Sequence, residues 1–318
     1  MKKRLLIAIF LVLGVNVGIF AQLSDTAAAD KLTKVTTDST AGWKFGAMAG
    51  LNFAQTKLVN WSAGGNSSLA LNGIFSAYAN YFKGKNSWIN TLDLGYGLLN
   101  QDNLAASTKK WQKTDDKINL SSQYGYKAYK KLYYAALFDF KTQFSPGYDD
   151  ANKRISDFFA PAYITAGVGI SYQPTQYLNM FLSPATARLV IVSDTALASN
   201  YSIEAGKTTR LEFGAYARFQ FAKNDFKAEL LKNVGITTRL DLFSNYLKNP
   251  QNIAVTWETL IAFKVNKYLS VNLNTNLMYD DNTKMDIVTT QADGTSVTKK
   301  EPRVQFKEIL GIGASVKF

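Results

Sequence analysis

The sequence contains no histidine and no cysteine, and these two absences remove most of the nucleophilic chemistry that side chains perform. Ser/His/Asp and Cys/His sites need an imidazole or a thiolate, so neither kind can form in this chain. A carboxylate pair or a Lys or Arg site remains available, but no spacing in the sequence singles one out. We therefore expect no enzymatic activity, no catalytic residue and no cofactor.

One short stretch carries oxygen ligands of the kind that a hard cation prefers. Asp280-Asp281-Asn282, with Asp286 close behind, could hold such an ion through carboxylate and amide oxygens. A solvated acidic loop explains the same residues, and we favour it. We predict no metal site.

A larger set of charged residues stands at alternate positions inside otherwise apolar segments. If the apolar faces of those segments point outward, the charged faces point into an enclosed interior. Such charges could line a polar pore that selects an anionic or zwitterionic solute, or form a salt-bridge network that closes the interior; both interpretations stay open. The residues in question are Asp93, Asp139, Lys141, Arg188, Arg210, Glu212, Arg218, Arg239, Asp241 and Glu258.

The first long connection contains Trp61 close to Gly64 and Gly65. This composition suits a tight loop in which an aromatic ring packs on backbone. The loop could fold inward as a constriction or a ligand platform, and simple loop packing is the favoured alternative.

Lysines gather at or beside the short connections of the chain. A basic belt at one rim would meet phospholipid headgroups or an acidic periplasmic protein, although solvated lysines at turns are an equal alternative. Nucleic acid, the usual partner of a basic chain, does not fit an exported protein. The lysines are Lys83, Lys85, Lys127, Lys130, Lys131, Lys223, Lys227, Lys264 and Lys267.

These side chains must be positioned by strands, because from Trp43 onward the hydrophobic pattern has a period of two. About twelve segments of 12 to 19 residues alternate in this way, far longer than the ~5 to 6 residues of a typical soluble strand. That length suits a tilted membrane crossing. The segments are 43–54, 68–82, 87–99, 117–128, 131–144, 161–173, 177–193, 208–222, 227–245, 252–265, 268–280 and 303–318.

Connection lengths alternate between short and long along these segments. Every even segment is followed by a turn of a few residues, such as 83–86 or 129–130, and odd segments are followed by longer loops. An even strand count with short periplasmic turns and longer extracellular loops is typical of an outer-membrane barrel. One strand changes parity after Pro184, and a β-bulge at residues 183–185 would repair it.

The two ends of the chain agree with export and membrane insertion. Residues 1–21 have Lys2, Lys3 and Arg4, an apolar run and then small residues, as in a secretory signal peptide. Residues 22–42 lack periodicity and are expected to be a flexible periplasmic segment before a barrel at 43–318. The last strand ends on Phe318, an ending that the outer-membrane assembly machinery is thought to recognise, and we expect Trp43 and Phe318 to be neighbours.

Several short motifs resemble a family of Bacteroidota outer-membrane proteins known as domain of unknown function 3078. This resemblance implies an outer-membrane barrel, but it implies no activity and no site residues. The motifs are Asn60 to Asn66, Leu182-Ser183-Pro184, Thr238-Arg239-Leu240 with Phe243, Trp257-Glu258, Asn266 to Leu269, Tyr279-Asp280-Asp281 and Lys307 to Gly313.

The sequence as a whole predicts an all-β transmembrane barrel in the outer membrane of a Gram-negative bacterium, with both termini in the periplasm. The leading functional hypothesis is a narrow pore for small hydrophilic solutes. In it Arg188, Arg210, Arg218 and Arg239 set the charge preference. The alternative is a non-conducting structural or assembly subunit of an outer-membrane complex.

Overall fold

The computed structural model describes residues 41–57, 67–101, 111–148, 153–266, 269–290 and 296–317. Several sequence expectations lie outside these ranges. They concern the signal peptide at 1–21, nearly all of the segment at 22–42, the loop residues Trp61, Gly64 and Gly65, and the terminal Phe318.

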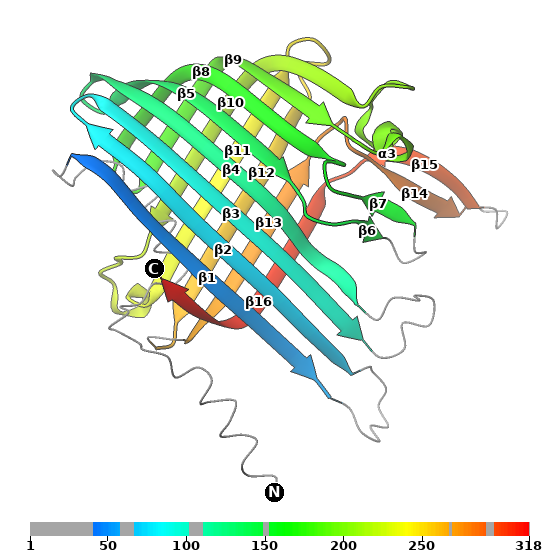
Figure 1. Cartoon of the computed structure of the whole chain (residues 1–318), viewed down its shortest axis with the longest axis horizontal. Coiled ribbons are helices and arrows are strands. Elements are labelled where there is room, and N and C mark those ends of the chain that lie inside the picture. Colours follow the sequence, from blue (N-terminus) through cyan, green and yellow to red (C-terminus); the bar gives the residue numbers. More distant parts are fainter. Residues whose placement is uncertain are drawn as a thin grey trace, which may run out of the picture.

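Twelve antiparallel strands close into a barrel (Figure 1), which confirms the predicted fold. In chain order, each strand pairs with the next, and the last pairs with the first. Their bounds are β1 Gly42–Thr56, β2 Ser68–Lys83, β3 Asn86–Gln101, β4 Gln112–Tyr129, β5 Leu132–Thr142, β8 Ala162–Thr175, β9 Leu178–Ile191, β10 Thr209–Lys223, β11 Val234–Asn245, β12 Ile253–Lys264, β13 Leu269–Tyr279 and β16 Gln305–Lys317.

The long connections at one end of the barrel carry structure of their own (Figure 1). β6 (Gly147–Tyr148) pairs with β7 (Arg154–Ser156), and β14 (Lys284–Thr290) pairs with β15 (Ser296–Pro302). A one-turn helix α3 (Thr195–Ala198) and a 3₁₀ turn η1 (Ser199–Tyr201) follow β9. None of the helices in the described ranges is long and apolar enough to cross a membrane.

The predicted start of the ninth strand is wrong. The ninth segment was expected to begin at residue 227, but β11 begins at Val234, and residues 229–231 form the 3₁₀ turn η2 (Glu229–Leu231). Glu229 and Lys232 form an i,i+3 ion pair there, and Leu230 is fully exposed. A helical turn brings such a pair together, so the connection after β10 is longer than the predicted tight turn.

The bulge predicted in β9 is present. Ile170 faces Leu182 and Val168 faces Ala185, so Ser183 and Pro184 together stand opposite a single residue of β8. The register of β10 shifts at the same place. Because one extra residue reverses the alternation, both Phe181 and Arg188 turn their side chains to the inside.

The barrel closes where β1 meets β16, which we call the seam. Pairing runs from Met48 opposite Lys317 to Asn52 opposite Gly313, a total of five residue pairs. The expectation that the two end strands join is therefore correct. Trp43 pairs with Tyr81 of β2, five residues along β1 from the pair made by Lys317.

Candidate functional site

The polar interior of the barrel holds two cavities in series. One, of about 200 Å³, lies in the half with the short connections, and the other, of about 340 Å³, lies toward the long connections. Both are lined by residues from strands on opposite walls, so they belong to the lumen. Four residues line both cavities and mark the place where they meet: Lys117, Glu258, Asn276 and Lys307.

Arg218 of β10 crosses the lumen between strands that are not neighbours. Its Nε donates to Asp241 Oδ1 at 2.7 Å, and its Nη1 donates to Asp139 Oδ1 and to Ser121 Oγ at 3.2 Å. Arg218 is 1% exposed, and both carboxylates are buried. The planar guanidinium satisfies two carboxylates at once, an arrangement for which lysine lacks the donors.

Three more charges surround this ion-pair group, which we call the Arg218 cluster. Arg239 donates to Glu258 Oε2 at 2.7 Å and its Nε lies 3.5 Å from Asp241, while Lys141 Nζ lies 3.5 Å from the same carboxylate. The cluster thus contains three cations and three carboxylates: Arg218, Arg239, Lys141, Asp139, Asp241 and Glu258. Their charges cancel.

A second ion-pair group lies nearer the long connections. Arg188 pairs with Glu212 and donates to Asp280 Oδ2 at 2.9 Å, and Arg210 Nη2 lies 3.3 Å from Glu212 Oε1. The Arg188 guanidinium also lies over the ring of Phe243, 4.4 Å from its centroid. Two cations again face two carboxylates, so this group is neutral as well.

Nine of the ten charged residues predicted to line the interior fall in these two groups, and the tenth, Asp93, accepts from Ser76 Oγ at 2.6 Å. Sequence reasoning missed four residues that line the junction or contact it. Asp115 stands in β4 ahead of residue 117, where the predicted strand began, and Lys117 is the first residue of that predicted strand. Lys307 and Asn276 share the inward parity of their strands. Parity alone could have found the last two.

The three aspartates considered as ligands of a metal ion already have other partners. Asp280 pairs with Arg188, Asp281 accepts from Asn252 Nδ2 at 2.9 Å, and Asp286 lies 3.0 Å from Lys153 Nζ. Across the described residues, no three acidic side chains come close enough together to hold a metal ion.

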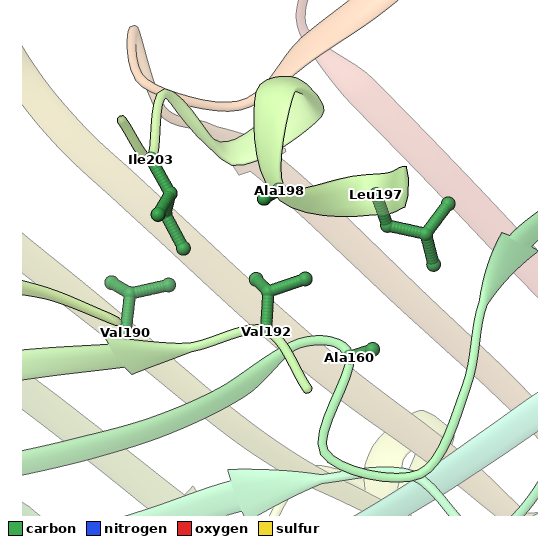
Figure 2. Close-up of a cluster of buried hydrophobic side chains, with 6 residues drawn as sticks. All are labelled: Ala160, Val190, Val192, Leu197, Ala198 and Ile203. Carbon is green, nitrogen blue, oxygen red and sulfur yellow. The ribbon is translucent and has the colours of Figure 1, made fainter. Parts of the chain in front are cut away.

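Residues 192–207, which we call the cap segment, fold over the end of the larger cavity. Leu197, Ala198 and Ile203 pack on Val190 and Val192 in a buried apolar cluster (Figure 2). Tyr201 lines the cavity, and its burial raises the pKa of the hydroxyl, so the phenol stays neutral at ordinary pH. The cap segment therefore narrows this end of the lumen.

Several hydrogen bonds hold the cap segment to the barrel wall and to neighbouring loops. Arg210 donates to the Tyr201 carbonyl, and Ser202 Oγ donates to the Asn282 carbonyl at 3.0 Å. Lys300 of the β14–β15 hairpin donates to Asn200 Oδ1 at 2.6 Å. Both the barrel wall and a neighbouring loop hairpin thus fix its position.

The predicted basic belt is concentrated on two adjacent short turns. Lys83 and Lys85 lie in the turn between β2 and β3, and Lys127, Lys130 and Lys131 lie in the turn between β4 and β5; all five are exposed. On the far side the positive charge is partly cancelled, because Lys223 donates to Asp225 Oδ1 at 2.8 Å. Of the remaining belt lysines, Lys227 and Lys264 are exposed and Lys267 lies outside the described residues.

The outside of the barrel is apolar and aromatic. Trp43 stacks with Phe45 and contacts Tyr81 and Trp88, with ring centroids 5.3 to 5.6 Å apart, on the outward face near the short turns. Exposed apolar residues outside and buried charges inside reverse the usual pattern of a soluble protein. This reversed pattern is that of a β-barrel that spans a membrane with its strands.

Comparison with known proteins finds one family model and several solved structures that are similar to this chain. The model of a family described as "Protein of unknown function (DUF3078)" matches residues 53–148, which confirms the resemblance over that part of the chain. No curated protein matches the sequence. Among solved structures, the chain is similar to an outer membrane channel from Pseudomonas putida F1, with 9% identity, a TM-score of 0.39 and coverage of 96% of this chain and 100% of that one. It is also similar to the translocator domain of the autotransporter NalP from Neisseria meningitidis, with 10% identity, a TM-score of 0.38 and coverage of 95% and 100%.

Proposed function

We propose that the barrel is a narrow, capped passage for small hydrophilic solutes and that it performs no catalytic step. The observation that carries the proposal is the junction of the two cavities at Lys117, Glu258, Asn276 and Lys307. This junction adjoins the Arg218 cluster only at Glu258, so a polar route passes beside the buried ion pairs without breaking them. The proposed route ends at the cap segment.

The proposal includes an orientation. Tight turns of outer-membrane barrels face the periplasm and longer loops face outward, so the basic belt and both termini would be periplasmic and the cap segment extracellular. Solutes would then enter past the cap segment and leave among the short turns.

The charge preference we propose is weak and anionic. The four arginines expected to set it are all ion-paired, so their fields largely cancel at the distance of a passing solute. Lys117 faces both cavities and makes no ion pair within the described residues. We assign the residual preference to this ammonium group.

Conductance in planar lipid bilayers tests the passage. We expect the purified protein to give small unitary currents and Ile203→Ser to raise the open probability about tenfold, which corresponds to roughly 1.4 kcal/mol lost from cap packing. Leu230→Ser is the matched control, because Leu230 is 90% exposed and far from the lumen. Lys117→Gln should lower the anion preference measured from reversal potentials. Absence of unitary currents from both wild type and Ile203→Ser would overturn the proposal.

One observation favours the rival function, a non-conducting structural or assembly subunit. The Arg218 cluster fills one side of the lumen, next to buried Phe181, Tyr216 and Phe243. A barrel built mainly to be rigid would show the same filling, and its basic belt would dock an acidic partner. Co-purification of such a partner in mild detergent, together with silent bilayers, would support this rival.

Phe318 has a separate proposed role in assembly. It follows β16 directly in the sequence, and we propose that the outer-membrane assembly machinery recognises it together with that strand. Deletion of Phe318 should lower the amount of heat-modifiable, membrane-inserted protein without changing its synthesis. Unchanged insertion of the deletion variant would overturn the proposal. Asn249→Ala, in a long connection, is the control substitution.

A further inference from the structure

The seam has far less backbone pairing than any other part of the barrel. β1 and β16 share five residue pairs, whereas each of the other neighbouring strand pairs shares ten or more. Above the pair Asn52–Gly313, residues 53–56 of β1 pair only with β2, and residues 305–312 of β16 pair only with β13. Two strand edges therefore face each other there without a ladder of hydrogen bonds among the described residues.

A membrane does not tolerate such edges without compensation. Backbone N–H and C=O groups that face hydrocarbon cost several kcal/mol each when unsatisfied, so these edges need water or a polar group beside them. Residues 54–57 of β1 are exposed at every position and not only at alternate ones. The upper seam is thus accessible from both faces of the sheet.

One ion pair bridges the barrel wall on the inside of this opening. Lys307 Nζ of β16 lies 2.5 Å from Asp115 Oδ1 of β4, so the side chain reaches past β1, β2 and β3. Gly95 of β3 leaves room for this reach, because a Cβ on it would lie 3.1 Å from Asp115 Oδ2 and from Lys117 Cε. Side-chain contact here takes the place of the missing backbone pairing.

The same lysine connects the seam with the lumen. Lys307 lines both cavities, yet its side chain is 45% exposed, whereas that of Asp115 is 4% exposed. Lys307 belongs to residues 305–312 of β16, which lack a partner on the β1 side, so this exposed lumen side chain stands beside the open strand edges. The junction of the two cavities therefore lies directly behind the upper seam.

The chemistry on the two sides of the opening differs sharply. Outside, the exposed side chains of Phe53, Phe306 and Leu310 are apolar. Inside stand two ammonium groups: Lys307 is paired with Asp115, and Lys117 makes no ion pair within the described residues. A molecule that satisfies both sides has an anionic head group and an apolar tail.

We propose that the upper seam is a lateral opening through which an anionic amphiphile passes between the membrane and the lumen. Its head group lies between Lys117 and Lys307, and its tail lies against the apolar outer residues of the seam. This inference rests on the proposed passage, because it adds a side entrance to it and names a second class of solute. The Lys307–Asp115 ion pair restricts the opening.

A disulfide between the two strands of the seam tests the lateral opening. Because the sequence has no cysteine, the two introduced thiols can react only with each other within the chain. Continuing the register of the five pairs would place Gln55 opposite Leu310, so Gln55→Cys with Leu310→Cys is the lock. Leu51→Cys with Ala314→Cys joins positions that are already paired and is the matched control. In purified, reduced protein we expect the control to cross-link rapidly and the lock only slowly under an added oxidant, because Cα atoms more than ~7 Å apart are bridged only after the backbone moves.

The probe is a photoreactive long-chain fatty acid added to the protein in phosphatidylcholine vesicles. The measured quantity is the amount of label on each peptide, determined by mass spectrometry. We expect labelling of β16 and of lumen residues, reduced about fivefold by the oxidised lock and restored by reduction, equivalent to roughly 1 kcal/mol. Labelling at Trp43 and Trp88 on the outer face should not change. Lys117→Gln should reduce lumen labelling, and Asp115→Asn, which frees Lys307, should increase it.

Each outcome decides between the two proposals. Lumen labelling that persists in the locked protein, or a lock that cross-links as fast as the control, overturns the lateral opening and leaves the passage intact. Lock-sensitive labelling in a protein that gives no unitary conductance supports the lateral opening and overturns the axial passage. Conductance that survives the lock while labelling is lost supports both.

Discussion

The Arg218 cluster and the seam hold the barrel together in opposite ways. Around Arg218 the strands are fully paired, and the side chain is 1% exposed with two carboxylate partners. At the seam the backbone pairing is short, and a single, half-exposed ion pair bridges the gap. One wall thus combines buried ion pairs with full backbone pairing, and we take that wall to be rigid. The opposite wall, with short backbone pairing, is the place where the barrel can open.

The sharpest way to break this comparison is to remove Arg218. Arg218→Ala leaves Asp139 and Asp241 with fewer partners in a buried site, and losing one partner of a buried ion pair costs about 3 to 5 kcal/mol. We expect a loss of that size in urea unfolding measured in lipid vesicles. Arg218→Lys is the control that keeps the charge but not the fork of donors. A loss below about 1 kcal/mol would show that the cluster is not the rigid side.

Two glycines sharpen the comparison at the level of the backbone. A Cβ on Gly214 of β10 would overlap the Ser244 carbonyl oxygen, whereas one on Gly311 at the seam would meet only the side chain of Asn52, whose Cβ is nearest at 3.3 Å. Overpacking against fixed backbone costs about 1 to 3 kcal/mol, so Gly214→Ala should destabilise the barrel by that amount. Gly311→Ala should change the unfolding free energy by less than about 0.5 kcal/mol. Equal effects at both positions would contradict a difference in rigidity.

The smallest expected effect on stability is at Lys307. Ion pairs with substantial solvent exposure contribute about 0 to 1 kcal/mol, so Lys307→Gln should barely alter unfolding in urea even though it removes a contact that crosses the wall. The same variant should increase the rate at which the lock cysteines cross-link. A large loss of stability without faster cross-linking would make Lys307 a structural residue of a closed wall.

Periodicity and connection lengths predicted most of the fold for a clear physical reason. A membrane strand must alternate along its whole length, so its signal repeats over many residues, and Pro184 marked the change of parity in β9. The prediction was wrong at residues 227–233 because a short stretch with Glu229 and Lys232 is compatible with a helical turn as well as with a strand end. The hairpin of β14 and β15 was expected only as a loop.

The interior was less accessible to sequence reasoning. Parity tells which side of the sheet a residue faces, and it selected Arg218, Asp139 and Asp241, but it says nothing about height or partner. Those depend on how far each strand is shifted against the next, which is a property of the closed barrel. The pairing of Lys307 with Asp115 and the five-pair seam depend on the same shift, so neither was predicted.

The lumen ion pairs also constrain how the barrel can be assembled. Lys307 and Asp115 are 192 residues apart in the chain, Lys141 and Asp241 are 100 apart, and Arg218 and Asp139 are 79 apart. No single hairpin contains any of these three pairs, although Arg218 with Asp241 and Arg239 with Glu258 meet on adjacent strands. Contacts between such distant residues form late because loop-closure entropy opposes them. A growing sheet therefore neutralises part of its interior as each hairpin is added, and the Lys307–Asp115 pair forms only when the final strand arrives.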